Sequence, residues 1–149
     1  MKRSPALLVA LTALSLAASL LGGCDGPSVE FHASDKAYSS PQTRLVLERI
    51  DASGLSDRPT QKADALRTSA LADLRSQGKA ASEAADLITS TFPPKTKSVP
   101  VYVERATVDG KSSFIIIEAW GPAEGKLDSK RLWVIARGTG DVIYSAATK

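Results

Sequence analysis

Cys24 and His32 are the only cysteine and the only histidine of this 149-residue chain, so any thiol or imidazole chemistry must use them. A cysteine nucleophile needs a base held against it, and a structural zinc site needs a cluster of such side chains. His32 lies in residues 25–40, a polar stretch rich in small residues that we interpret as a flexible tether. The sequence therefore predicts no catalytic residue, no metal site and no cofactor.

Two carboxylates that meet in one pocket can act as general acid and general base, which draws attention to Glu104 and Glu118. They flank Asp109-Gly110, a dipeptide typical of a two-residue hairpin turn. Such a turn places Glu104 opposite Ile115 and Glu118 opposite Val101. Because positions 101 and 104 differ by three, the two carboxylates are predicted on opposite sheet faces unless a bulge shifts the register. We expect one of them to be exposed and the other to lie at a sheet edge.

The first 23 residues have the three parts of a secretory signal peptide. Lys2 and Arg3 form a positive start, the 16 residues 6–21 carry no charge, and Gly22 and Gly23 follow. A membrane-spanning helix needs about 20 apolar residues, so this run is short for a permanent span. The pattern predicts an exported protein, with an uncleaved membrane anchor as the alternative.

The tetrad Leu21-Gly22-Gly23-Cys24 resembles the lipobox of bacterial lipoproteins, in which an aliphatic residue and two small residues precede a cysteine. The resemblance implies cleavage between Gly23 and Cys24 and a diacylglyceryl group on the Cys24 thiol. Two acyl chains of the palmitate type hold a protein stably on a membrane, whereas one is marginal. It implies anchoring to membrane lipid at the outer face of the bacterial cytoplasmic membrane, where Asp25 favours retention if the cell has two membranes. The other interpretations of Cys24 are an ordinary buried thiol, which its flanks Gly23, Asp25 and Gly26 disfavour, and a disulfide to another chain.

Cleavage would divide the chain into a signal peptide (1–23), a lipidated tether (24–40) and one domain (41–149). The tether would reach about 20–24 Å r.m.s.. Docking of part of it on the domain is the alternative, because Val29, Phe31 and Tyr38 are too apolar for an ideal spacer. Loss of Lys2 and Arg3 lowers the Lys and Arg count from 19 to 17, against 16 Asp and Glu. No basic stripe remains, so nucleic acid is not expected as a partner.

Apolar periodicity predicts helices first and strands afterwards. Three helices are expected over residues 41–54, 56–78 and 81–92, with a strand over 44–50 as an alternative to the first. Four strands are expected over 99–108, 114–120, 132–136 and 142–146. The expected fold class is α+β, with two or three N-terminal helices packed on a four-stranded antiparallel meander. This plan resembles small bacterial envelope lipoproteins without an assigned function.

Trp120 and Trp133 lie on the two strands joined by residues 121–129 and are expected to be neighbours. Large aromatic side chains are usually buried between sheet and helices. The alternative is an uncovered sheet face on which Tyr102, Ile117 and the tryptophans form a partner-binding surface.

The sequence thus favours a non-enzymatic envelope lipoprotein that binds an unknown envelope protein or a small amphiphile. The alternatives are a structural subunit of an envelope complex and, less favoured, a hydrolase that works without histidine.

Overall fold

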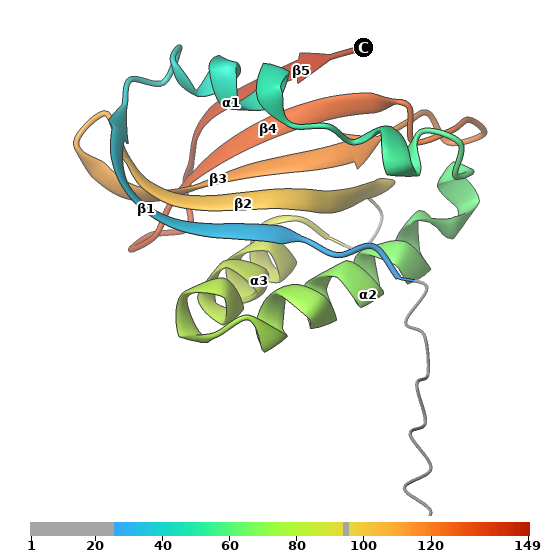
Figure 1. The fold of residues 1–149 in the computed structure, drawn as a ribbon, viewed down its shortest axis with the longest axis horizontal. Coiled ribbons are helices and arrows are strands. Elements are labelled where there is room, and N and C mark those ends of the chain that lie inside the picture. The colour runs from blue at the N-terminus through green and yellow to red at the C-terminus, as the bar shows by residue number, and fades with distance from the viewer. Residues whose placement is uncertain (1–25, 94–95) are drawn as a thin grey trace, which may run out of the picture.

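The computed structural model describes residues 26–93 and 96–149, which form three α-helices and one five-stranded mixed sheet (Figure 1). Two short 3₁₀ helices, Ser53–Leu55 and Thr60–Lys62, lie between α1 and α2. The predicted signal peptide, the predicted cleavage site between Gly23 and Cys24, and Cys24 itself lie outside the described residues. The elements in chain order are β1 (Glu30–Tyr38), α1 (Thr43–Arg49), α2 (Ala63–Ser76), α3 (Lys79–Thr91), β2 (Ser98–Val108), β3 (Lys111–Trp120), β4 (Ser129–Ala136) and β5 (Val142–Thr148).

The sheet corrects the predicted four-stranded antiparallel meander. Its order is β1-β2-β3-β4-β5, and β1 pairs with β2 in parallel while the other pairs are antiparallel. A parallel pair needs a long crossover, and here the three helices between β1 and β2 provide it. The extra strand comes from residues 30–38, which we had interpreted as part of the tether.

Strand β1 could not be predicted from its sequence, because apolar and polar residues do not alternate along it. Phe31, Ser34 and Tyr38 are half-buried, and the other six residues of β1 are exposed. The pairing with β2 is also interrupted between Ala33 and Ala37. An edge strand of this kind is stabilised by backbone hydrogen bonds to its neighbour more than by burial, so periodicity alone cannot detect it.

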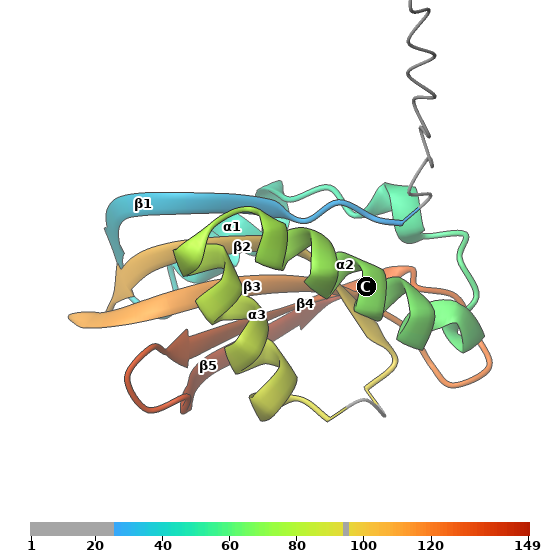
Figure 2. The same cartoon turned by 90° about the horizontal axis from the view of Figure 1, so that it is seen from below.

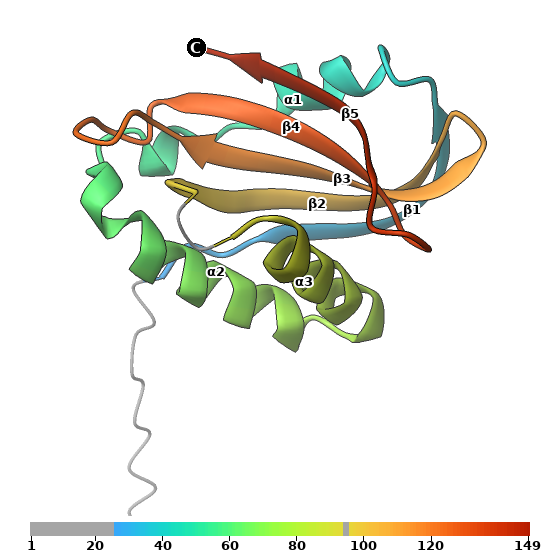
Figure 3. The same cartoon turned by 180° about the vertical axis from the view of Figure 1, so that it is seen from behind.

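Helices cover both faces of the sheet, as Figures 1 and 3 show from opposite sides. Helices α2 and α3 pack side by side on one face, also seen from below in Figure 2. Helix α1 lies on the other face. Two hydrophobic clusters follow from this arrangement: one includes Leu74, Ile88 and Ile116, and the other includes Leu47 and Ile115.

The helices form where apolar periodicity predicts them, with different lengths. The stripe of α2 is buried at Ala70 and Leu74, and that of α3 at Ala84 and Ile88. The first helix is shorter than predicted, and the helical reading of this segment is confirmed over the strand alternative. Its last carbonyls are capped from β4, because Lys130 Nζ donates to the carbonyls of Leu47 and Ile50 at 2.8 and 2.7 Å.

The hairpin between β2 and β3 is confirmed at its turn. Asp109 and Gly110 both have positive φ, 48° and 77°, as a two-residue turn of this kind requires, and Val108 pairs with Lys111. Further along, a bulge between Pro100 and Tyr102 shifts the register. Among the residues that the structure describes, no helix is both long and apolar enough to cross a membrane.

Candidate functional site

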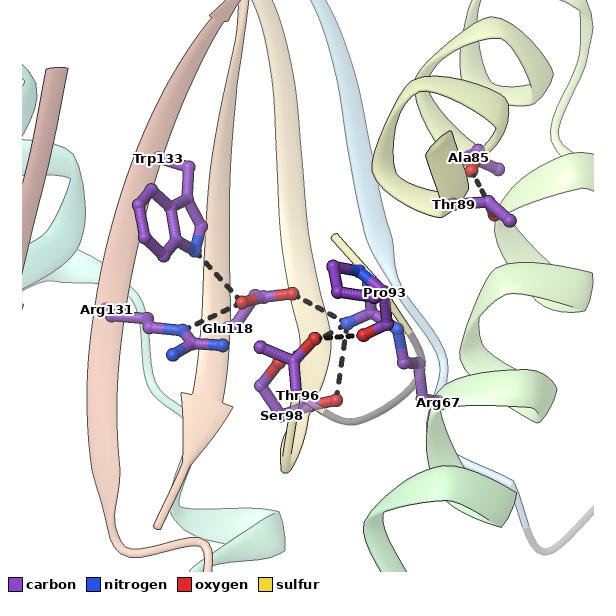
Figure 4. Close-up of polar contacts among 9 residues, drawn as sticks. All are labelled: Arg67, Ala85, Thr89, Pro93, Thr96, Ser98, Glu118, Arg131 and Trp133. Atoms are coloured by element: carbon purple, nitrogen blue, oxygen red, sulfur yellow. Dashed lines mark hydrogen bonds and ion pairs between the residues drawn. The ribbon is translucent and has the colours of Figure 1, made fainter. Parts of the chain in front are cut away.

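Glu118 lies at the centre of a buried polar cluster on the face covered by α2 and α3 (Figure 4). Arg67 of α2 donates to Glu118 Oε1 at 2.8 Å, while Arg131 and the indole of Trp133 donate to Oε2 at 2.9 and 3.0 Å. Arg67 Nη1 also lies 3.3 Å from the hydroxyl of Ser98. The cluster joins one helix to strands β2, β3 and β4, which indicates that it positions α2 on the sheet.

Two arginines around one carboxylate give this cluster a formal charge of +1 in an almost dry environment. Glu118 is 0% exposed, and the side chains of Arg67 and Arg131 are 6% and 18% exposed. The Arg131 guanidinium also lies over both tryptophan rings, 5.7 Å from the Trp120 centroid and 5.3 Å from that of Trp133. The two tryptophans, expected to be neighbours, do not pair across the strands, since Trp120 pairs with Ser129 and Trp133 with Ile116. They share the Arg131 cation instead.

Glu104 forms a second buried cluster on the opposite face, under α1. Tyr38 donates to Glu104 Oε1 at 3.0 Å and Tyr102 donates to Oε2 at 2.8 Å. Arg49, at the end of α1, approaches Oε2 at 3.8 Å. Burial, followed by the hydrogen bond to Glu104, raises the pKa of both Tyr38 and Tyr102.

The two carboxylates do not converge on one site. The predicted pairing of Glu104 with Ile115 is confirmed, but Glu118 pairs with Pro100 rather than Val101 because of the bulge in β2. The expectation of one exposed and one edge carboxylate is wrong, since both are at most 1% exposed. Each carboxylate is instead surrounded by donors from the protein itself, which is how buried charges are ordinarily stabilised.

The residues predicted to share a partner-binding surface are divided between the two faces. Tyr102 and Ile117 are buried in the hydrophobic cluster beneath α1. Trp120 and Trp133 are half-buried around Arg131, on the side of Glu118. No bare sheet face holds all four, because helices cover both faces.

His32 and the acidic residues give no metal centre within residues 26–93 and 96–149, where no group of three potential ligands is found. The imidazole lies on β1, with Nε2 2.5 Å from Glu30 Oε1 and the ring centroid 5.5 Å from that of Tyr102. A small cavity of about 310 Å³ lies here, lined by His32, Arg49 and Glu104 among others.

A larger cavity, of about 590 Å³, lies where the described chain begins. We call it the N-terminal cavity; its lining includes Pro27, Val29, Leu55, Arg58, Leu66 and Val101. Its volume is in the range of ordinary small-molecule sites. Three charged residues line it: Arg58, Glu30 and Asp51. Hydrogen bonds from the backbone N–H and then the hydroxyl of Ser53 lower the pKa of Asp51, so this carboxylate is negatively charged at neutral pH.

No protein-family model, curated protein or solved structure matches the chain.

Sequence reasoning missed Arg67, Tyr38 and the N-terminal cavity. A signal for the first was present: Arg67 falls between Ala63 and Ala70 on the apolar stripe of α2, and Glu118 lies within the apolar run of β3. Opposite charges at two core positions indicate a buried ion pair. No comparable signal marked the cavity, because its lining comes from the N-terminal segment, a loop, α2 and β2.

Proposed function

We propose that this chain is an exported bacterial lipoprotein, anchored through acylated Cys24 at the outer face of the cytoplasmic membrane, whose domain binds a small amphiphile without transforming it. The N-terminal cavity carries the proposal. Its volume of about 590 Å³ exceeds that of the cavity beside His32, about 310 Å³, and Gly26, two positions after Cys24, helps to line it.

The lining of the cavity suits a ligand with an apolar part and a zwitterionic head. Half-buried Leu66 and Val101 offer apolar surface, above Val29 and Leu55, which are almost fully buried. Arg58 can pair with a phosphate, and Glu30 or Asp51 can pair with an ammonium group. A lysophospholipid with an ethanolamine head combines these features.

The arrangement of the two buried carboxylates supports a binding role over the hydrolase hypothesis. Two carboxylates that work as general acid and general base must meet in one pocket, whereas Glu104 and Glu118 lie on opposite faces of the sheet. Both oxygens of Glu104 and both oxygens of Glu118 accept hydrogen bonds from the protein's own side chains. Each carboxylate is therefore explained by its role in holding the fold together.

Titration calorimetry with lysophosphatidylethanolamine, below its micelle concentration, tests the ligand class. The protein for this test is residues 24–149 with Cys24→Ser, which retains every described residue. Arg58→Gln should weaken binding about tenfold or more, because a charge-assisted hydrogen bond is lost. Arg44→Gln is the matched control, since Arg44 is an exposed arginine on α1 that does not line the cavity. Equal affinities of the two variants, or no binding by the parent protein, would refute the assignment.

A further inference from the structure

The N-terminal segment is fixed to the domain from its first described residues. The backbone of Gly26 lies so close to Ser69 of α2 that a Cβ at position 26 would be 1.8 Å from the Ser69 hydroxyl oxygen. The Val29 N–H donates to Asp73 Oδ2 at 2.8 Å, and Gln77 Nε2 donates to the Val29 carbonyl at 2.7 Å. Ser69, Asp73 and Gln77 are spaced by four residues, so one face of the helix end holds the segment.

This contact leaves almost no chain between the proposed anchor and the domain. Cys24 is two positions before Gly26, and two residues span at most about 7 Å. The polar head-group layer on one side of a bilayer is itself roughly 5–8 Å thick. A diacylglyceryl group on Cys24, with its acyl chains in the hydrocarbon, therefore brings Gly26 to the surface of the head groups.

We propose that the domain rests directly on the lipid head groups, with the N-terminal cavity at the membrane side. This inference depends on the lipidation of Cys24 in the proposed function. The short link between Cys24 and Gly26 holds the domain against the head groups. Electrostatic attraction to anionic lipid does not, because this end of the molecule exposes the acidic residues Asp51 and Asp57 as well as Arg58. An amphiphile leaving the membrane could then enter the cavity without crossing bulk water.

The orientation distinguishes the two ends of the sheet. Strand β1 begins at Glu30, beside the cavity, and ends at Tyr38, whose carbonyl accepts from Asp109 N at the β2–β3 turn. Nine residues of strand span roughly 30 Å. The β4–β5 turn lies at this same far end, since Arg137 N donates to the Ser112 carbonyl. Figures 1 and 2 show this turn opposite the point where the described chain begins.

Single labels at the two ends test the orientation. Because Cys24 is the only cysteine and would be acylated, one added thiol can be labelled alone. Gly54→Cys lies on the cavity lining and Gly138→Cys in the β4–β5 turn, and in both places an added Cβ meets nothing within 4 Å. Each lipidated protein, with a fluorophore on its thiol, is placed in vesicles of phosphatidylethanolamine and phosphatidylglycerol that contain a lipid with a nitroxide on its head group.

The fluorophore at position 54 should be quenched several-fold more than the fluorophore at position 138. A Gly/Ser linker of about twelve residues between Asp25 and Gly26 adds roughly 20 Å of reach and should remove the difference. Equal quenching at both positions with the natural spacing, or a difference that the linker leaves unchanged, would overturn the inference. Intact mass and vesicle flotation identify failure of the proposed function separately, since an unacylated protein would not float with the vesicles.

Discussion

At the scale of single residues, Glu118 shows how a charged side chain becomes part of a hydrophobic interior. A buried carboxylate is stabilised when donors of the protein replace the water around it, and Arg67, Arg131 and Trp133 donate three hydrogen bonds to Glu118. Removing the carboxylate leaves two cations facing one another in the interior. The loss of stability arises more from burying two unpaired arginines than from losing their attraction to Glu118.

Glu118→Ala should therefore lower the free energy of unfolding by about 3–5 kcal/mol. The control is Asp57→Ala, which removes a carboxylate that is also paired with a cation, Lys126, but is 94% exposed. An exposed pair of this kind contributes at most about 1 kcal/mol. Urea unfolding followed by tryptophan fluorescence measures both changes. Similar losses in the two variants would show that the Glu118 cluster does not hold α2 on the sheet.

Tyr102 makes the stability of the fold sensitive to alkaline pH. Its folded-state pKa lies above the ordinary tyrosine value, so the unfolded chain releases this proton first as the pH rises. The contribution of Tyr102 to the free energy of unfolding is therefore fully present below about pH 10 and is lost as the pH increases beyond this value. The same sign applies to Tyr38.

The urea concentration at the unfolding midpoint of the parent protein should accordingly decrease as the pH is raised from about 10 to about 11. The midpoint of Tyr102→Phe should decrease less steeply over that interval. Tyr144→Phe is the control, because Tyr144 on β5 is a half-buried tyrosine that packs against the same hydrophobic cluster without contacting Glu104. Parallel pH profiles for the parent and Tyr102→Phe would contradict the assignment.

At the scale of elements, the helices and the turn that depend on local periodicity and turn chemistry could be predicted from the sequence. Helices α2 and α3 were expected because their apolar residues recur every three to four positions, and the β2–β3 turn because Asp109-Gly110 tolerates positive φ. Strand β1 was missed because its pairing partner, β2, is about 70 positions away and its own residues show no period. The bulge at Val101 was missed as well, and it moved Glu118 opposite Pro100.

Because residues 30–38 form strand β1, the N-terminal segment is part of the domain rather than a tether. A tether of sixteen residues would separate anchor and domain, whereas the structure packs the segment on α2 from Gly26 onward. Glycine is required at position 26 because of this close approach. The contact between this segment and α2 is thus a testable element of the fold.

Gly26→Ala should destabilise the domain by about 1–3 kcal/mol, because the new methyl group collides with Ser69. Gly54→Ala is the matched control: it is the same substitution at a position where an added Cβ meets nothing within 4 Å. Hydrogen exchange of the Val29 amide should also accelerate in Gly26→Ala alone. An unchanged stability and exchange rate would mean that residues 26–29 are not docked on α2.

At the scale of the whole molecule, the protein is asymmetric along its sheet. Helices cover both sheet faces, and the N-terminal cavity lies at the end of the sheet where β1 begins. The N-terminal cavity and Gly26, the described residue nearest in sequence to Cys24, lie at the same end. This coincidence connects the proposed anchor with the proposed binding site, because an amphiphile and the acyl chains of Cys24 would share one bilayer.

Cys24→Ser separates the anchor from the fold. Serine cannot form the thioether, so the precursor should remain uncleaved or the protein should leave the membrane, while the domain keeps its stability because every described residue lies beyond position 24. Gly22→Ala is the control: it keeps a small residue in the tetrad and should be processed and retained like the parent. Membrane fractionation and intact mass report the anchor, and urea unfolding reports the domain. Normal processing and retention of Cys24→Ser would exclude lipidation at this residue, and with it the contact of the N-terminal cavity with the head groups.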